Sequence, residues 1–304
     1  MKNAYAVVAG SSPRAGLSFA PADYLELLKP RLNLLVVATS AAGYYLGASG
    51  PPDLVPMTQA VAGTALVAGG AAVLNQVFER DTDALMRRTR NRPIPDGRVT
   101  VVEAYLFGVA VSCAGLVTLA MLANMVAAVL AFCTLFIYLA IYTPLKRRSP
   151  AATLVGAVPG ALPALIGWAA RSGGVSVGGW SLAAIVFCWQ VPHFMAIAWL
   201  YRDDYGRAGL RTLPVIDPGG TRTAHLAIGY ATALVPLSVL PTVTGVTGAL
   251  SAAIALVLGL ALLCCAVLFA MKRTEHAAWT LFFGSIVYLP LLWMAIIGGR
   301  IWGI

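Results

Sequence analysis

The chain contains 304 residues, of which 59% are apolar and only 11% are charged, whereas soluble proteins carry about 25% charged residues. Its mean hydropathy of +0.81 and its repeated long apolar runs exclude a soluble globular protein and indicate a polytopic helical membrane protein. The net charge of +9 does not indicate nucleic-acid binding, because the basic residues are distributed as membrane topology requires.

Nine apolar segments follow one another along the chain, separated for the most part by Gly, Pro or charged residues. The expected spans are residues 32–49, 55–75, 102–121, 124–143, 152–170, 180–200, 224–243, 248–271 and 277–299. We therefore predict an all-α protein in which residues 23–304 form one domain with nine transmembrane helices in a lipid bilayer. Residues 1–22 are expected to form a partly disordered cytoplasmic segment.

The basic residues indicate the orientation of the spans. All of them except Arg171 and Arg300 lie in the N-terminal segment or in connections that follow even-numbered spans. Because cytoplasmic loops are enriched in Lys and Arg, we expect the N-terminus in the cytoplasm and the C-terminus outside a prokaryotic inner membrane. The long cytoplasmic connections, residues 76–101 and 201–223, also hold most of the acidic residues. Catalytic groups are therefore expected at this face.

The stretch NQVFERDTDALMRRTRNRP, residues 75–93, interrupts the apolar pattern. Asn75, Glu79 and Asp83 are spaced i, i+4, i+8, which places them on one face of a helix. Carboxylates at this spacing repel each other, so a cation is expected between them. Oxygen ligands suit Mg²⁺, and the neighbouring arginines suit phosphate oxygens. The pattern therefore outlines a diphosphate site, although spacing alone is also compatible with a juxtamembrane loop held by surface ion pairs.

A second polar stretch, YRDDYGRAGLRTLPV, begins at Tyr201 and again mixes acids with arginines. Asp203 and Asp204 follow an even-numbered span, as the first stretch does. Two carboxylate clusters at one face could hold one diphosphate through two metal ions.

At these residues the chain resembles the UbiA superfamily of intramembrane prenyltransferases, and within it the branch that farnesylates haem. The superfamily pattern N-D-x-x-D-x-x-x-D, followed by arginines and a proline, corresponds to Asn75, Gln76, Glu79 and Asp83 and then to RTRNRP. Four further segments carry the resemblance: DYLELLKPRLNLL (23–35), YTPLKRRSPAATLVGAVPGALPALIGW (142–168), WQVPHF (189–194) and DDYGRAGLRTLPV (203–215).

The chain departs from the superfamily pattern at several positions. Gln76 stands where an Asp is usual, and Glu79 replaces the second Asp. The second stretch lacks D-x-x-x-D, because Tyr201 and Tyr205 occupy the places of those acids. This weakens the transfer of a second metal site, and it favours the haem branch, where a DDY form is expected.

The resemblance implies nine helices around a central cavity and Mg²⁺-dependent transfer of a farnesyl group from farnesyl diphosphate to a vinyl group of haem b, giving haem O. It also suggests a downstream partner, a haem A synthase, that would receive the product. The implied metal ligands are Asn75, Glu79, Asp83, Asp203 and Asp204, and the implied diphosphate-binding residues are Arg80, Arg88, Arg90, Arg92 and Lys146. Tyr142 and Lys146 form a Y-x-x-x-K pair at a position expected to bind the diphosphate.

His193 is expected well inside the membrane, about ten residues before Asp203. From the residue alone, a hydrogen bond within the bundle, to Gln190 for example, is the favoured interpretation. An ionisable residue at such depth is nevertheless a functional candidate, and the resemblance implies a role at the haem, as axial ligand or as proton carrier.

Three alternatives remain open from the sequence. The first is the same reaction with another acceptor, such as an aromatic quinone precursor or a chlorophyllide. The second is a transporter, which the lack of a two-half repeat disfavours. The third is a non-catalytic haem- or lipid-binding membrane protein, which would not need the acidic stripe.

Overall fold

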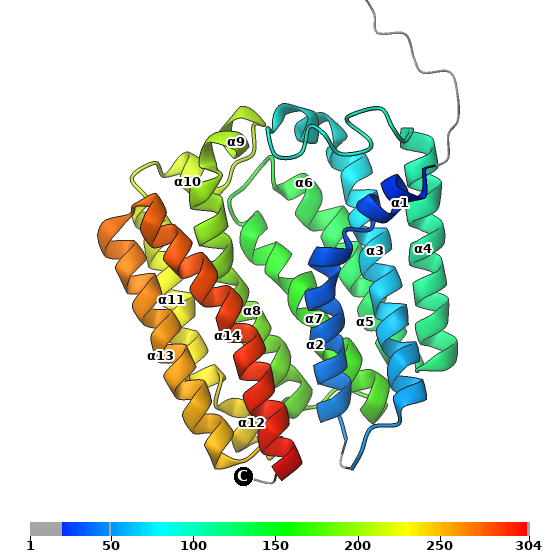
Figure 1. Ribbon diagram of the computed structural model, residues 1–304, viewed down its shortest axis with the longest axis vertical. Helices are drawn as coiled ribbons and strands as arrows, with labels where there is room; N and C mark the ends of the chain where they lie inside the picture. The colour runs from blue at the N-terminus through cyan, green and yellow to red at the C-terminus, as the bar shows by residue number, and fades with distance from the viewer. Residues whose placement is uncertain (1–19, 49, 303–304) are drawn as a thin grey trace, which may run out of the picture.

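A computed structural model describes residues 20–48 and 50–302, and within these residues the protein is helical without any strand. Most of the segment predicted to be partly disordered, residues 1–19, lies outside the described residues. The long helices run side by side, with most of the short helices at one end of the bundle (Figure 1). The all-α prediction is confirmed.

The helices follow the expected order along the chain. They are α1 Pro21–Leu27, α2 Pro30–Leu46, α3 Leu54–Leu85, α4 Val101–Leu122, α5 Met125–Phe136, the π-helix η1 Ile137–Tyr142, α6 Thr143–Leu145, α7 Ala152–Ser172, α8 Val177–Leu200, α9 Arg202–Arg207, α10 Leu213–Ile216, α11 Thr221–Leu237, α12 Leu240–Val243, α13 Ala249–Lys272 and α14 Glu275–Trp302.

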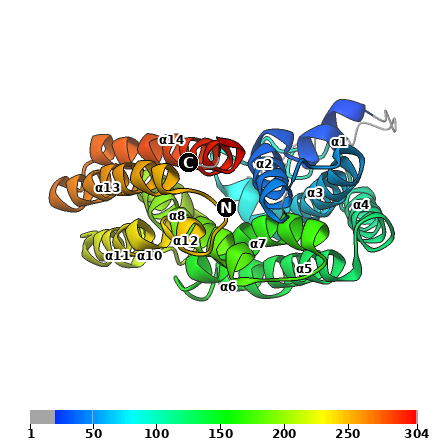
Figure 2. The same ribbon diagram turned by 90° about the horizontal axis from the view of Figure 1, so that it is seen from below.

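The predicted number of spans was slightly too high. In the described part of the chain, eight helical stretches are long and apolar enough to cross a membrane by length and composition. The ninth candidate, α2, has 17 residues, which gives a length of about 26 Å against a hydrocarbon core of about 30 Å. It lies among the other helices nonetheless, packed against α7 and α3 (Figures 1 and 2).

Small residues allow α2 and α7 to approach closely. A Cβ added to Gly167 of α7 would collide with the carbonyl oxygen of Ser40, and a Cβ added to Gly43 of α2 would collide with that of Ala164. Close approach through small residues is the usual basis of helix association in lipid. The contact fixes α2 against the wall formed by α7.

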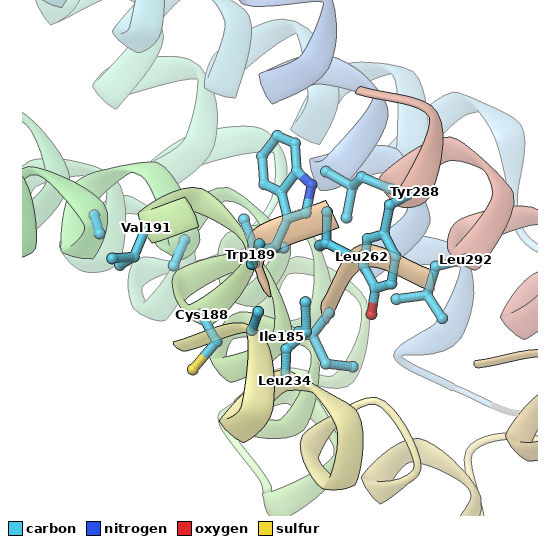
Figure 3. Close-up of a cluster of buried hydrophobic side chains, with 14 of the residues drawn as sticks. Ile185, Cys188, Trp189, Val191, Leu234, Leu262, Tyr288 and Leu292 are labelled. Atoms are coloured by element: carbon cyan, nitrogen blue, oxygen red, sulfur yellow. The ribbon is translucent and has the colours of Figure 1, made fainter. Parts of the chain in front are cut away.

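Helix α8 lies between α7, α11 and α14. Its Trp189 and Ile185 pack with Leu234 of α11, Leu262 of α13 and Tyr288 of α14 in a continuous buried cluster (Figure 3). This apolar core packs α8 closely against α14.

Two features near the polar stretches differ from the expected boundaries. Helix α3 continues to Leu85, so residues 76–85, assigned by the sequence to a connection, are helical and the connection begins at Met86. Helix α5 passes into η1 and then α6. Such π segments occur frequently at functional sites, and here the π segment carries Tyr138 and Tyr142.

Candidate active site

Two cavities adjoin inside the bundle. The first, with a volume of about 330 Å³, is called the polar cavity and includes Asn75, Glu79, Asp83, Arg88, Arg92 and Lys146 in its lining. The second, of about 390 Å³, is called the apolar cavity and includes Val36, Val67, Ala71, Pro163, Trp189 and His193. Five residues line both: Lys29, Leu32, Tyr138, Tyr142 and Phe194. The two cavities therefore meet at a shared boundary of one cation and four apolar or aromatic side chains.

Glu79 lies on α3 with both carboxylate oxygens occupied. Lys146 Nζ donates to Oε1 at 2.8 Å, and Asn75 Nδ2 donates to Oε2 at 2.7 Å. The oxygen of the Asn75 amide faces Thr143, whose Oγ1 lies 2.9 Å away. In this arrangement Asn75 orients Glu79 through its nitrogen, and its oxygen does not face the carboxylates as a metal ligand would.

Lys146 follows α6 and lies with its Nζ 4.3 Å from the centre of the Tyr142 ring. Burial by itself would lower the pKa of Lys146, but the adjacent Tyr142 and Glu79 outweigh it and raise that pKa above its ordinary value. The ammonium group is therefore charged at neutral pH. The expected Y-x-x-x-K pair does line the polar cavity.

Asp83 is 1% exposed and occupies the last turn of α3. Its Oδ2 accepts from Arg92 Nη1 at 2.5 Å. Its Oδ1 is buried and has no hydrogen-bond partner among the described residues. An unmatched buried carboxylate oxygen is costly, which marks this atom as a position where a cation or a donor would be stabilised.

The predicted arginines divide into two groups. Arg92 and Arg88 line the polar cavity, and the Arg88 guanidinium lies 5.3 Å from the ring centre of Tyr201. Arg80 is ion-paired with Asp81 at 3.5 Å on the outside of α3. Arg90 is exposed and does not line the cavity. The structure thus brings two of the four arginines to the site.

The second acidic pair is not brought to the polar cavity. Asp203 is exposed, and Asp204 pairs with Arg207. Tyr205 lines the cavity instead. Burial raises the pKa of Tyr205. In the described residues no group of three His, Cys, Asp or Glu side chains could hold a metal, and neither Asp203 nor Asp204 lines the polar cavity.

His193 lies on α8 and lines the apolar cavity. Gln190 is not its partner, because that amide donates to the carbonyl oxygens of Val186 and Ala157. The partner is Ser285 of α14, whose Oγ lies 2.8 Å from His193 Nδ1. The sequence offered no signal for this contact, since the two residues are 92 positions apart.

Lys29 was missed as a site residue and counted only among the basic residues of the N-terminal segment. It adopts a left-handed conformation, with φ of 50°, between α1 and α2, a conformation that is uncommon outside glycine. Asn33 Nδ2 donates to Leu28 O at 2.6 Å, and Gln76 Nε2 donates to Leu27 O at 2.8 Å. The two amides hold this chain reversal over the cavities.

The Lys29 ammonium has no ion-pair or hydrogen-bond partner in the described part of the chain. Burial lowers the pKa of Lys29 to about 7, with a further decrease from Arg92. The only sequence signal was its place directly before Pro30 in a segment that carried the family resemblance.

Comparisons with known proteins agree with this geometry. The sequence pattern of the UbiA prenyltransferase family matches residues 36–294. The Protoheme IX farnesyltransferase of Solibacter usitatus is 43% identical over 89% of this chain and 96% of its own. That of Opitutus terrae is 44% identical over 96% of this chain and 98% of its own.

Two solved structures share the fold. A UbiA homologue from Aeropyrum pernix has a TM-score of 0.71 at 21% identity and covers 90% of this chain and 98% of its own. A UbiA homologue from Archaeoglobus fulgidus bound to GPP and Mg²⁺ has a TM-score of 0.64 at 18% identity, covering 90% and 99%. The family pattern extends over most of the sequence, and the solved structures reproduce the arrangement of the helices. The chain therefore belongs to the UbiA prenyltransferase family.

Proposed function

We propose that this prenyltransferase moves the farnesyl group of farnesyl diphosphate to a vinyl group of haem b, with addition of water, in a Mg²⁺-dependent reaction that gives haem O. The observation that carries the proposal is that the polar cavity adjoins the apolar cavity, which His193 lines. Relatives that span nearly the whole chain are named for protohaem IX farnesylation. A fold neighbour was solved with GPP and Mg²⁺.

The residues of the polar cavity fit a magnesium ion. Glu79 and Asp83 would hold it, since their carboxylates lie one turn apart on α3 and Asp83 Oδ1 has no other partner among the described residues. Few protein ligands suffice, because Mg²⁺ keeps waters and takes phosphate oxygens as its other ligands. When bound, the ion would neutralise charge that develops on the leaving diphosphate.

Lys146 and Arg92 are the natural partners of the diphosphate itself. Each is now paired with one carboxylate, and a competing cation on those carboxylates would free both side chains for phosphate oxygens. Lys29 lies at the boundary between the cavities. If the farnesyl group enters the apolar cavity and the diphosphate stays in the polar cavity, the carbon–oxygen bond to be broken lies at this boundary. We assign to Lys29 the stabilisation of the leaving oxygen.

The apolar cavity supplies the second requirement of the reaction. The diphosphate departs with the electron pair of the C–O bond, leaving an allylic cation that water would quench. The faces of Tyr138, Tyr142 and Phe194 at the boundary can stabilise that cation. The vinyl π electrons of haem b then form the new C–C bond. The cation left on the vinyl group takes up water and releases one proton, which the free diphosphate can accept.

The experiment is a conversion assay with purified protein in detergent, haem b, farnesyl diphosphate and Mg²⁺, analysed by mass spectrometry. Wild type should form a farnesylated, hydrated haem, and Glu79→Gln and Asp83→Asn should not. Asp81→Asn is the matched control, because Asp81 lies on the same helix but is 71% exposed in its side chain and does not line the cavity.

Different failures have different meanings. If folded wild type forms no such product but consumes farnesyl diphosphate with an aromatic acceptor, the haem assignment is wrong and the prenyl transfer stands. If Glu79→Gln and Asp83→Asn keep full activity, the assignment of the metal site is wrong.

A further inference from the structure

Ser285 of α14 is fully buried and takes part in three hydrogen bonds behind Trp189 and His193, which line the apolar cavity. Its Oγ lies 2.6 Å from the carbonyl oxygen of Phe282 and 2.8 Å from His193 Nδ1. Its own carbonyl oxygen accepts from Trp189 Nε1 at 2.7 Å. Both Trp189 and His193 lie on α8, so Ser285 of α14 contacts the imidazole and one of its ring neighbours at the same time.

The position of one proton follows from this geometry. A carbonyl oxygen only accepts, and two oxygens 2.6 Å apart without a proton between them would repel each other, so the Ser285 hydroxyl donates to Phe282 O. A hydroxyl has one proton, and therefore Oγ accepts from His193. Nδ1 must then carry the proton, and in the neutral ring Nε2 carries the lone pair.

The ring is also held against rotation. Trp189 stacks on one face of His193, with a centroid distance of 5.2 Å and an interplanar angle of 19°. The Phe282 ring also stacks on the His193 ring, with a centroid distance of 5.1 Å and an interplanar angle of 21°. Nε2 has no hydrogen-bond partner among the described residues, and His193 lines the apolar cavity.

We propose that Ser285 is a positioning residue that fixes His193 with its proton on Nδ1, so that Nε2 ligates the iron of the haem acceptor. Nε2 donates its lone pair to an open axial position of the iron, and no proton is released. A histidine bound to a metal ordinarily donates its other N–H to a fixed acceptor, which Ser285 Oγ provides. The neutral ring has no proton to deliver from Nε2, and the proton released on hydration can be accepted by the free diphosphate, so we assign His193 the role of ligand. The identity of the acceptor rests on the proposed function, whereas the position of the proton does not.

The first test needs no haem. Protein labelled with ¹⁵N-histidine is placed in lipid nanodiscs, and the imidazole ¹⁵N shifts are recorded. The chain has three histidines, so His193→Gln assigns the signal. We expect a protonated Nδ1 and an unprotonated Nε2 in wild type and in Ser285→Thr, and a mixture of tautomers in Ser285→Ala. The matched control is Ser181→Ala, because Ser181 is a buried serine on α8 whose hydroxyl donates to Gly178 O at the same spacing. A protonated Nε2 in wild type would overturn the proposal.

The second test adds haem b and records the Soret band and the iron–histidine stretching band of the reduced complex. We expect the stretching band in wild type, its loss in His193→Gln, and its shift to lower frequency in Ser285→Ala. Haem affinity in Ser285→Ala should fall about tenfold or more, the effect of removing such an outer partner. Ser285→Thr and Ser181→Ala should match wild type.

The outcomes separate the two hypotheses. If wild type converts haem b while its spectrum is unchanged in His193→Gln, iron ligation is refuted and the proposed function stands. If wild type neither binds nor converts haem b, both iron ligation and the haem assignment fail.

Discussion

Glu79 and Asp83 lie one turn apart on α3, yet their surroundings differ. Both oxygens of Glu79 are engaged, by Lys146 and Asn75, whereas Asp83 has one oxygen paired with Arg92 and one that is buried without a partner. The i, i+4 spacing predicted that these carboxylates share a helix face, and both do line the polar cavity. Which cations approach them depends on residues 9 and 67 positions away, and spacing along one helix cannot specify such contacts.

Replacing Lys146 by Gln should lower kcat about 10²–10³-fold, the usual cost of removing one group that stabilises a developing anion. The KM for farnesyl diphosphate should change less, because the lysine acts most strongly on the leaving group. Steady-state kinetics on the purified variant measure both quantities. Arg147→Gln is the control, since Arg147 is the next residue, is exposed and does not line the cavity. Equal effects of the two substitutions would mean that only the general positive charge matters.

Lys29 should react with an amine-acylating reagent near neutral pH. The neutral amine is the reactive form, and it predominates above the pKa, which burial lowers to about 7. The rate of labelling should therefore rise as pH increases through 7 and level off above it. Inorganic diphosphate with Mg²⁺ should slow the reaction by favouring the ammonium form and by covering it. Peptide mass spectrometry measures the labelling, with the exposed Lys272 as the reference within the same molecule.

Gln76→Glu tests whether Gln76 positions Lys29. The amide of Gln76 donates a hydrogen bond to Leu27 O, and a carboxylate cannot. The reversal between α1 and α2 should loosen, and diphosphate should then protect Lys29 less. Unchanged protection would mean that Gln76 does not position the lysine. An Asp at this position could not make the contact, because its side chain has no N–H to donate.

At the scale of helices, the apolar runs predicted most boundaries well because they are set by the thickness of the membrane. The errors fall where polar helix continues beyond the apolar run. Helix α3 extends to Leu85, since nothing in the stretch up to that residue terminates it and contacts from Lys146 and Arg92 stabilise its carboxylates. After α8, the short helix α9 places Tyr205 at the polar cavity and leaves Asp203 exposed. Apolar periodicity carries no information about such a short element.

The contact of α2 with α7 can be tested by Gly167→Val. A side chain at Gly167 would collide with the backbone of Ser40, which cannot move without displacing α2. We therefore expect the free energy of unfolding to fall by about 1–3 kcal/mol. The thermal unfolding midpoint in detergent should fall by several degrees. Gly174→Ala is the control, because a Cβ there would meet nothing within 4 Å. An unchanged midpoint would show that α2 is not fixed by this contact.

Over the whole molecule, the charged groups are concentrated at one end. The helices α1, α6, α9 and α10 lie at that end, and α14 finishes at the opposite one (Figure 1). In the part of the chain that the structure describes, the two basic residues at the far end have structural partners: Arg171 donates to Pro51 O, and Arg300 donates to Val246 O and Ala48 O. The asymmetry is therefore a property of the folded bundle as well as of the sequence.

We expect the charged end to face the cytoplasm, because cytoplasmic loops retain Lys and Arg. In a background in which the five native cysteines are replaced, Asp96→Cys places a thiol in the connection after α3, and Gly174→Cys places one between α7 and α8. A membrane-impermeant maleimide applied to right-side-out vesicles should label only Gly174→Cys, and inverted vesicles should give the opposite result. Detergent should make both positions reactive, which controls for buried thiols. The reverse pattern would place the polar cavity on the outer side, where cytoplasmic farnesyl diphosphate could not reach it, and would contradict the proposed function together with the topology.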